Sequence, residues 1–369
     1  MAGNIREKET HVAASDISDL ESLEQYCAEN NLNIIRIGDR PRVKLHPYHW
    51  KWEAIEPAVI AASKHVRLAT DAADESGVVR RLVGRVNPPN PKGARFGLNL
   101  SVQCVLPGEQ AYTHRHSAAA TRFIIKGSPN AFTTVDGEPF PLETGDFITT
   151  PHLTFHGHAN ESDDYVLWLD GLDVAFAGHG MGWHEELEGG FETIRRDRID
   201  ESIRTLSGNL LPSSHKKTTH PEGPQIKHIG AEHPPAFRYT WKQTSAALAT
   251  MKENEYDEDP FDCYTVMYRH PITGGPTFPT TANDMTMLTP GFKGRDHRHN
   301  SSVIYYAFRG QGVMTVEGER FEWSAGDFIE LPAWTTHRHE NPSQEDSFLY
   351  GFTDWPAQQA LGQYYYEDL

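Results

Sequence analysis

The chain has 369 residues, of which 38% are hydrophobic and 11% aromatic, and its formal net charge is −17 at pH 7. This length is sufficient for two compact domains, and the negative charge disfavours a nucleic-acid partner because phosphate backbones would be repelled. The sequence has no apolar run long enough to span a bilayer, so we expect no membrane association.

The amino-terminal segment MAGNIREKETHVAAS is polar and mixed in charge. It lacks the apolar centre and the small-residue cleavage site of a secretory signal. The three cysteines, Cys27, Cys104 and Cys263, are far apart and form neither a disulfide framework nor a Cys-x-x-Cys metal pair. We therefore expect a cytoplasmic protein.

Helical and strand-rich stretches alternate along the chain. Within residues 16–66, SDISDLESLEQYCAENNL and WKWEAIEPAVIAASKHV carry apolar residues at helical spacing behind Ser and Asp capping candidates, which predicts helices. From about residue 80, short segments such as GLNLSVQCVL, RFIIKG and DFITTP are rich in Val, Ile, Phe and Thr and are separated by Gly and Pro. These segments predict a sandwich or barrel up to about Phe176.

The second half repeats this order of elements. Residues 178–236 contain many Gly, His, Pro and Ser and predict a long connection with some local helix. A helix predicted near WKQTSAALATMKENEYDED precedes further strand segments, among them VIYYAFRG, GVMTVEGERFEW and DFIELP. The predicted parts are a helical leader 1–75, an amino-terminal β domain 76–177, a connecting segment 178–260, a carboxy-terminal β domain 261–356 and a tail 357–369.

The two β domains share motifs in register. PGEQAYTHRH aligns with PGFKGRDHRH, and Gly108 and Gly291 each stand six residues before the first His. Downstream, GDFITTPHLTFHGHAN at 145–160 aligns with GDFIELPAWTTHRHEN at 326–341 without a gap. A match of this length in the same order indicates two copies of one domain.

Each copy carries two histidines one residue apart and a third histidine in the downstream motif. Alternate residues of a strand project from one face, so the paired histidines can both bind one metal ion. The third histidine completes a set of three imidazole ligands. Three imidazoles bind Zn, Ni or Cu at least as tightly as Fe, so the spacing leaves the metal open. The predicted ligands are His114, His116 and His156 in the first copy and, as a possible second site, His297, His299 and His337.

The motifs Gly-x5-His-x-His and Gly-x5-Pro-x4-His-x3-Asn resemble those of the cupin superfamily. The resemblance implies an all-β-dominated bicupin, with two double-stranded β-helix (jelly-roll) barrels that bind metal inside. Many cupins carry a glutamate four or five residues after the histidine pair, where this chain has Ala120, Thr121, Val303 and Ile304. The missing carboxylate disfavours an oxalate decarboxylase. A non-catalytic bicupin that binds a small acid is a further alternative, against which the intact histidine triads argue.

Together with RRLVGRVNP, TFHGHANES, WLDGLD and TGGPTFPT, these motifs are similar to the gentisate 1,2-dioxygenase group of bicupins, which includes relatives that cleave salicylate and 1-hydroxy-2-naphthoate. The resemblance implies one Fe(II) per chain, held by the first triad, and a hydroxylated aromatic acid and O2 as substrates. It also implies ring opening between the carboxyl-bearing and hydroxyl-bearing carbons, and a homo-oligomer, a tetramer. The product would be a ring-opened oxo diacid.

The same resemblance assigns residues around the substrate. Arg81 and Arg122 occupy the places of arginines that pair with the substrate carboxylate, a task suited to the planar guanidinium. His158 matches a histidine near the hydroxyl oxygen, and Gln103 and Asp170 match two other positions at the substrate. Arg122, His158 and Asp170 are the candidates for catalysis.

Two features depart from the family pattern. Asn99 stands where relatives commonly have Trp or Tyr, which opens space and makes a salicylate with a polar or bulky ring substituent a candidate substrate beside gentisate. In the second copy, Tyr305 or Tyr306 stands near the place of Arg122. We therefore expect ring cleavage in the first barrel.

Overall fold

The computed structural model describes residues 15, 17–30, 46–66, 82–84, 98–174, 176, 184–187, 190–191, 193–206, 235–254 and 258–369. Residues 1–45 form one unit and residues 46–369 another. The first unit contains the predicted helix α1 (Leu20–Glu29), which begins with a capping box: Asp19 accepts from the backbone N–H of Ser22, and the Ser22 hydroxyl caps Asp19 in return.

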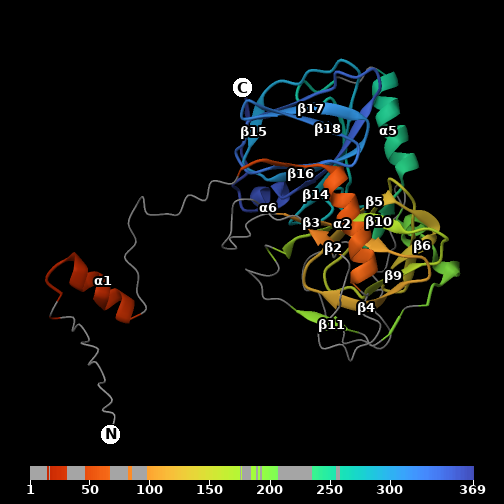
Figure 1. The fold of residues 1–369 in the computed structure, drawn as a ribbon, viewed down its shortest axis with the longest axis horizontal. Coiled ribbons are helices and arrows are strands. Elements are labelled where there is room, and N and C mark those ends of the chain that lie inside the picture. Colours follow the sequence, from red (N-terminus) through yellow and green to blue (C-terminus); the bar gives the residue numbers. More distant parts are fainter. Residues whose placement is uncertain are drawn as a thin grey trace, which may run out of the picture. The chain divides into compact units, whose positions relative to one another are not determined.

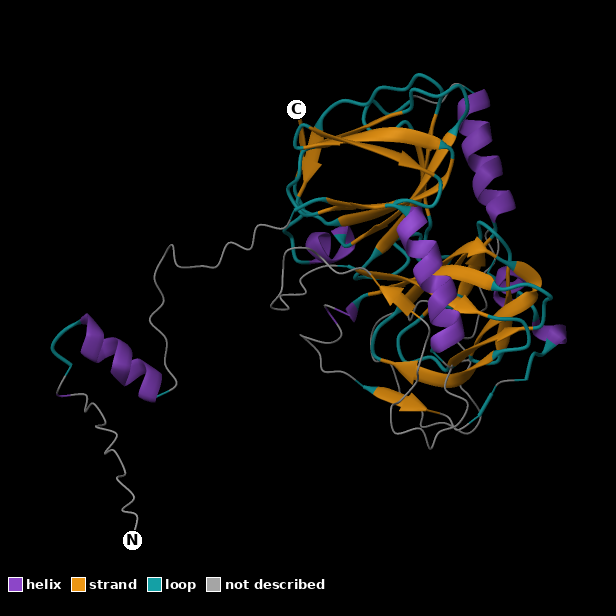
Figure 2. Cartoon of the chain, in the orientation of Figure 1, coloured by secondary structure: helices purple, strands orange, loops and turns teal. Residues whose placement is uncertain are grey.

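Strands build most of the second unit, and its longer helices lie outside them (Figure 2). One barrel joins a six-stranded sheet, in the order β12-β8-β5-β10-β3-β2, to a five-stranded sheet, in the order β11-β4-β9-β6-β7. Its strands are β2 (Leu82–Gly84), β3 (Asn99–Val105), β4 (Gln110–His116), β5 (Ala120–Lys126), β6 (Ser128–Val135), β7 (Glu138–Leu142), β8 (Phe147–Thr150), β9 (His156–Asn160), β10 (Val166–Leu172), β11 (Glu185–Leu187) and β12 (Phe237–Tyr239).

The other barrel repeats this plan with the orders β1-β19-β16-β21-β14-β13 and β18-β17-β20-β15-β22. Figure 1 shows the two barrels next to each other in residues 46–369. The strands are β1 (Tyr48–Trp50), β13 (Tyr264–Met267), β14 (Ala282–Leu288), β15 (His297–His299), β16 (Val303–Arg309), β17 (Gln311–Val316), β18 (Glu319–Ser324), β19 (Phe328–Leu331), β20 (His337–Glu340), β21 (Ser347–Thr353) and β22 (Tyr366–Asp368). The helices of this unit include α2 (Trp52–His65), η2 (Arg196–Arg198), α4 (Glu201–Thr205), α5 (Trp241–Glu253) and α6 (Trp355–Ala360).

The predicted bicupin fold is confirmed, with the strand-rich segments as strands and the helices near WKWEAIEP and WKQTSAAL as α2 and α5. The structure adds short strands in stretches expected to be helix or loop. These are β1 in the leader, β11 and β12 in the connection and β22 in the tail. Each has only three residues, too few for an alternating pattern to show in the sequence. The domain boundaries stay a prediction.

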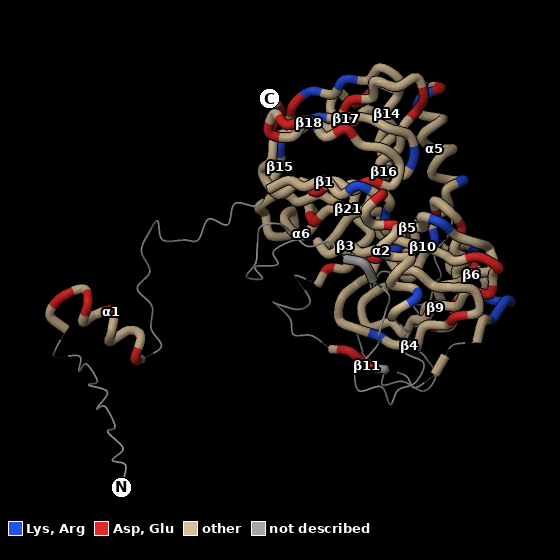
Figure 3. The backbone as a smooth tube through the Cα atoms, viewed as in Figure 1, with Lys and Arg blue, Asp and Glu red and all other residues tan. Residues whose placement is uncertain are grey.

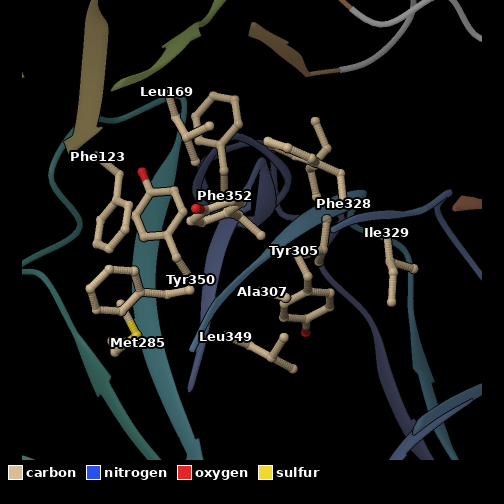
Figure 4. Close-up of a cluster of buried hydrophobic side chains, with 14 of the residues drawn as sticks. Phe123, Leu169, Met285, Tyr305, Ala307, Phe328, Ile329, Leu349, Tyr350 and Phe352 are labelled. Atoms are coloured by element: carbon tan, nitrogen blue, oxygen red, sulfur yellow. The ribbon is translucent and has the colours of Figure 1, made fainter. Parts of the chain in front are cut away.

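The largest apolar core lies between the two six-stranded sheets. Leu100, Val102 and Cys104 of β3 belong to it together with Met285 and Met287 of β14. The ring of Phe123 on β5 stacks on that of Tyr350 on β21, with centroids 4.5 Å apart (Figure 4). Because both sheets bury one face here, the barrels form one compact unit.

The opposite face of the first six-stranded sheet lines the barrel interior, and its side chains change character along the strands. Ile124, Ile148, Val166 and Trp168 form an apolar cluster with residues of β6 and β7 at one end. Gln103, Arg122, Thr150 and Asp170 share this face because each stands two residues from an apolar member of the cluster. The interior is therefore apolar at one end and polar at the other.

Two strand–helix units are exchanged between the barrels. β1 and α2 precede the first barrel in the chain, yet β1 pairs with β19 of the second barrel. β12 and α5 precede the second barrel, yet β12 pairs with β8 of the first. Helix α2 then lies against β2 and β3, and α5 lies against β13. Each helix thus returns to the barrel of its own repeat.

The repeated Gly-Asp turn fixes both exchanged units. Asp146 accepts a hydrogen bond from the backbone N–H of Trp241 (2.8 Å), and Asp327 accepts one from the backbone N–H of Trp52 (2.9 Å). The glycine before each aspartate has a left-handed φ, of 90° and 97°, and a Cβ there would collide with the same tryptophan. The motif GDFI is therefore a docking point for the other half of the chain.

We expect Asp327→Asn to lower the free energy of unfolding by about 2 kcal/mol at pH 7. Burial raises the pKa of Asp327, but hydrogen bonds from His49, the backbone of Trp52 and Lys51 outweigh it and bring the pKa to about 2. A carboxyl with a depressed pKa stabilises the fold above its unfolded pKa, and this contribution disappears as the pH falls from about 4 to about 2. Thermal unfolding between pH 7 and pH 3 measures the effect.

The deficit of the Asp327→Asn protein should be full at pH 7 and shrink below about pH 4. Asp163→Asn is the matched control, because Asp163 is exposed in a loop of the first barrel and should not change the melting temperature. Equal stability of the Asp327→Asn and Asp163→Asn proteins at pH 7 would contradict the anchoring role.

Candidate functional site

The first histidine triad comes together inside the first barrel. His114 and His116 lie on β4, and His156 lies opposite His114 on the neighbouring strand β9. The ring centroids of His114 and His156 are 4.2 Å apart, and those of His116 and His156 are 4.9 Å apart. One ring nitrogen of each histidine lies within 4.8 Å of the others. All three side chains are buried.

Backbone carbonyls orient the three imidazoles. The Nδ1 atoms of His114, His116 and His156 lie 2.9, 2.8 and 3.0 Å from the carbonyl oxygens of residues 112, 118 and 154. A carbonyl only accepts hydrogen bonds, so each Nδ1 carries the proton and each Nε2 presents a lone pair. Metal-binding histidines are commonly held in this way. The triad therefore fits a metal ion.

A buried arginine and a buried aspartate lie on the same interior face. Arg122 of β5 pairs in register with Asp170 of β10, and the Nε–Oδ1 distance is 3.4 Å between two side chains with no exposed surface. The Arg122 guanidinium also donates to the hydroxyl of Thr150 on β8. Asp170 and Thr150 together fix the orientation of a permanent positive charge inside the barrel.

Gln103 and His158 add hydrogen-bonding groups. Gln103 on β3 is fully buried, and neither atom of its amide has a hydrogen-bond partner among the described residues. His158 follows His156 by two residues on β9, and its Nδ1 lies 3.0 Å from the hydroxyl of Thr133. Asn99 begins β3 on the same face as Gln103 and is exposed. Arg81 lies outside the described residues.

Sequence reasoning missed three side chains of this region, namely Thr150, Thr133 and Trp168. Thr150 holds Arg122, and Thr133 contacts His158. The centroid of the Trp168 ring lies 4.8 Å from that of His158, and Trp168 belongs to the apolar cluster of the interior. A usable signal was the difference between the two copies, because the aligned residues of the second copy at positions 150 and 168 are both leucines.

The second triad has the same arrangement in the second barrel. His297 lies opposite His337, with ring centroids 4.1 Å apart, and one ring nitrogen of each of the three histidines lies within 4.8 Å of the others. Burial, followed by the nearness of His297, lowers the pKa of His299 to about 4. Burial also lowers the pKa of His297 and of His337. At pH 7 these imidazoles are neutral, the form that binds metal ions.

The strand register resolves which tyrosine replaces the arginine. Arg122 is opposite Asp170 in the first barrel, and in the second barrel Tyr305 is opposite Gly351. Tyr305 therefore occupies the place of Arg122, and Gly351 occupies the place of Asp170. Tyr306 points into the core between the barrels, 6.0 Å from the ring of Phe123.

Comparison with known proteins supports this arrangement. The family model of the cupin domain matches residues 101–172 and 284–350. The chain is 34% identical over 370 residues to a 1-hydroxy-2-naphthoate 1,2-dioxygenase of Nocardioides sp. (strain KP7), covering 96% of this chain and 89% of that protein. It is 33% identical to a gentisate 1,2-dioxygenase of Haloferax sp., covering 85% and 86%.

The fold is also that of a solved structure. The salicylate 1,2-dioxygenase of Pseudaminobacter salicylatoxidans superimposes with a TM-score of 0.80 at 24% identity, covering 96% of this chain and 99% of that one. Among the helices that the structure describes, none is long and apolar enough to cross a membrane. Given its identity to curated relatives over most of their length, the chain belongs to the gentisate and salicylate 1,2-dioxygenase family of bicupins.

Proposed function

We propose that the first barrel binds one Fe(II) between His114, His116 and His156 and uses O2 to open the ring of a hydroxylated benzoate. The bond that breaks joins the carboxyl-bearing carbon to the carbon that bears the ortho hydroxyl group, and the product is a ring-opened oxo diacid. The observation that carries the proposal is the buried neutral triad on the same barrel interior as the buried cation Arg122. Bound Fe(II) supplies open coordination positions and the redox chemistry of a non-haem oxygenase.

The charges support an anionic chelating substrate. Three neutral imidazoles leave the full charge of a divalent ion uncompensated, and a substrate that brings a carboxylate and a phenolic oxygen would balance it. We propose that Arg122 binds the carboxylate through its guanidinium, which Asp170 and Thr150 hold in place. Arg81 is proposed as a second carboxylate partner.

Two further groups would act on the hydroxylated edge of the ring. We propose that His158 Nε2 takes up the proton of the ortho hydroxyl group, with Thr133 fixing the imidazole through its Nδ1. Gln103 offers a buried amide whose donors and acceptor are satisfied by no described residue, so it is proposed to hydrogen-bond the substrate. We propose that the buried apolar cluster that includes Trp168 shields the substrate ring from water.

Metal reconstitution tests the proposed function. The protein is stripped of metal, loaded anaerobically with Fe(II), Zn(II) or Ni(II), and mixed with O2 and gentisate, salicylate, substituted salicylates or 1-hydroxy-2-naphthoate. We expect the Fe(II)-loaded protein, but not the Zn(II)- or Ni(II)-loaded protein, to take up oxygen with at least one of these acids. The aromatic absorption of that acid should disappear at the same time. Absence of uptake with every acid, in protein shown to contain Fe(II), would contradict the proposal.

We expect Asn99→Trp to change the ranking of ring-substituted salicylates. Asn99 lies on the interior face at the exposed start of β3, so an indole there would reduce the space for a bulky substituent. The ratio of kcat/KM for substituted over unsubstituted salicylate should fall by roughly tenfold or more, because steric discrimination of small groups is worth about 1–3 kcal/mol. Asn130→Trp, at an exposed position of β6, is the matched control. An unchanged ranking would place the ring substituent elsewhere.

We also propose a cytoplasmic homotetramer. The similarity of most of the chain to the dioxygenase relatives supports this proposal. Lys and Arg positions are interspersed with Asp and Glu positions along the backbone of both barrels (Figure 3). Light scattering coupled to gel filtration gives the mass; a monomer of 41.6 kDa would contradict the tetramer.

A further inference from the structure

We propose that Asp173 is a positioning residue for the first histidine triad, and that Thr280 of the second barrel holds Asp173 in place and so influences how tightly this triad binds its metal. This inference rests on the metal site proposed for the first barrel, but it concerns residues outside that site. Asp173 directly follows β10, and Thr280 lies in the loop between β13 and β14. Thr280 ends the stretch TGGPTFPT, to which the proposed function gives no role.

The turn 117–119, which joins β4 to β5, determines the orientation of His116. The carbonyl oxygen of residue 118 lies 2.8 Å from Nδ1 of His116, so Nε2 is the atom that this imidazole presents to a metal. A displacement of the carbonyl would rotate the ring and move Nε2 out of the position that a shared metal ion requires. The orientation of His116 is therefore only as well fixed as the turn.

Asp173 holds one end of this turn through two hydrogen bonds. Its Oδ1 accepts from the backbone N–H of Ala119 (2.8 Å), and its own N–H donates to the carbonyl of Ala119 (3.4 Å). The Asp173 side chain is buried, which strengthens its hydrogen bonds. His152 holds the other end, because its Nδ1 donates to the carbonyl of Ser117 (2.7 Å). Side chains from two other segments thus fix the turn.

Thr280 connects the second barrel to both of these side chains. Its hydroxyl donates to Oδ2 of Asp173 (2.5 Å), and Nε2 of His152 lies 3.8 Å from the same oxygen. Phe278, two residues before Thr280, is fully buried, and its ring meets that of His152 edge-on with centroids 6.0 Å apart. The loop after β13 therefore contacts both residues that hold the turn.

The core between the barrels fixes this loop in its turn. The hydroxyl of Thr277, three residues before Thr280, donates to Oδ1 of Asn283 at 3.1 Å. Nδ2 of Asn283 donates to the hydroxyl of Tyr350 at 2.7 Å, and Tyr350 belongs to the largest apolar core. All of these side chains except Thr280 are buried. The position of Thr280 is therefore set by contacts of the second barrel.

The second barrel has the same clamp at its own triad, without a contact from the other barrel. Asp354 aligns with Asp173; its Oδ1 accepts from the N–H of Ser302 (2.8 Å), and its own N–H donates to the carbonyl of Ser302 (3.4 Å). Ala333 stands at the place of His152. No described side chain of the first barrel donates a hydrogen bond to the Asp354 carboxylate. The aspartate clamp belongs to the repeat, whereas the contact between barrels is found at the first triad.

These contacts predict that a change in the second barrel alters the first metal site. Groups that orient a metal-binding histidine commonly account for about 10–100-fold in metal affinity. Asp173 acts on His116 through the backbone of residues 118 and 119, so we expect the lower end of this range. Thr280 acts through Asp173, so its effect should be smaller than that of Asp173.

Co²⁺ binding to the full-length His337→Ala protein tests the role of Asp173. His337→Ala removes a member of the second triad, so bound Co²⁺ reports on the first. In this background, we expect Asp173→Ala to lower the Co²⁺ affinity about tenfold in competition with a chromophoric chelator. It should also shift the visible absorption bands of the bound ion, which depend on the geometry of its ligands.

Asp354→Ala in the same background is the matched control, because it removes the equivalent clamp from the second barrel. It should leave the affinity and the bands of the first site unchanged. Equal Co²⁺ affinities of the Asp173→Ala and Asp354→Ala proteins would overturn the positioning role. Absence of Co²⁺ from the His337→Ala protein itself would contradict the proposed metal site and, with it, this inference.

Two variants of Thr280 test the contribution of the second barrel. Thr280→Val removes the hydroxyl with little change of shape, and we expect a smaller loss of Co²⁺ affinity than in Asp173→Ala. Thr280→Ser keeps the hydroxyl and should keep the original affinity. Thr273→Val, at an exposed position of the same loop, is the control and should also keep it.

The Thr280 pair decides the outcome even if the Asp173→Ala protein fails to fold, because each variant changes a single small side chain. Equal affinities of the Thr280→Val and Thr280→Ser proteins would show that the second barrel does not act on the first triad through this hydroxyl. An equal loss in Thr273→Val would also overturn the role of Thr280. None of these measurements involves O2, so they are independent of ring cleavage.

Discussion

His156→Ala should abolish oxygen uptake and leave the first barrel without iron. Two neutral imidazoles hold Fe(II) poorly, and His156 is the ligand contributed by β9, opposite His114. The change removes a buried side chain and should cost about 1–3 kcal/mol of stability, which leaves the protein folded. Iron content after anaerobic loading, circular dichroism and oxygen uptake with the preferred acid give the three readouts.

His65→Ala is the control for this variant, because His65 is exposed at the end of α2. It should retain its iron and its activity. A His156→Ala protein with normal iron content and full oxygen uptake would rule out this ligand set, whereas loss of iron with retained uptake would place the reaction at another centre.

Arg122→Lys should reduce kcat/KM by roughly tenfold to a hundredfold while the iron content stays normal. Lysine keeps the charge but loses the planar pair of donors, and one charge-assisted hydrogen bond is worth about 1.5–3 kcal/mol. A neutral replacement is a poorer test, because it would leave the buried Asp170 carboxylate without its cation and cost about 3–5 kcal/mol of stability.

The control is Arg320→Lys on β18, where the side chain is 52% exposed. Steady-state oxygen uptake across the panel of acids compares the two. An unchanged kcat/KM in the Arg122→Lys protein would show that the carboxylate binds elsewhere. Loss of iron or of folded protein alongside the loss of kcat/KM would instead assign Arg122 a structural role.

The repeated motifs made the two barrels and both triads predictable. The GDFI turn, the paired histidines and the third histidine recur in register. This repetition predicts two β domains of the same fold. Strand periodicity then placed His114 and His116 on one face, and the structure brings their ring nitrogens together with that of His156. The prediction was possible from spacing alone, because side chains two residues apart on a strand point to the same face.

Other features depend on contacts between distant segments. The pairing of β1 with β19 joins a strand of three residues to one of four. Strands this short leave no room for a periodic pattern, so the sequence did not predict the exchange between the barrels. Thr150 could have been found by comparing the two repeats of the sequence. It aligns with a leucine in the second repeat, and such a change from polar to apolar indicates that the interiors of the two barrels differ in function.

The exchanged strand–helix units constrain the order in which the chain can fold. His49 and Asp327 are joined across 278 residues, so β1 leaves the ribosome long before its partner strand exists. At about 5–20 residues per second, the wait is roughly 15–55 s. During that time Trp50 and Trp52, which finally pack on the core between the barrels, have nothing to cover them. Closing so long a loop comes late in folding, which makes the nascent first half a natural client for a chaperone.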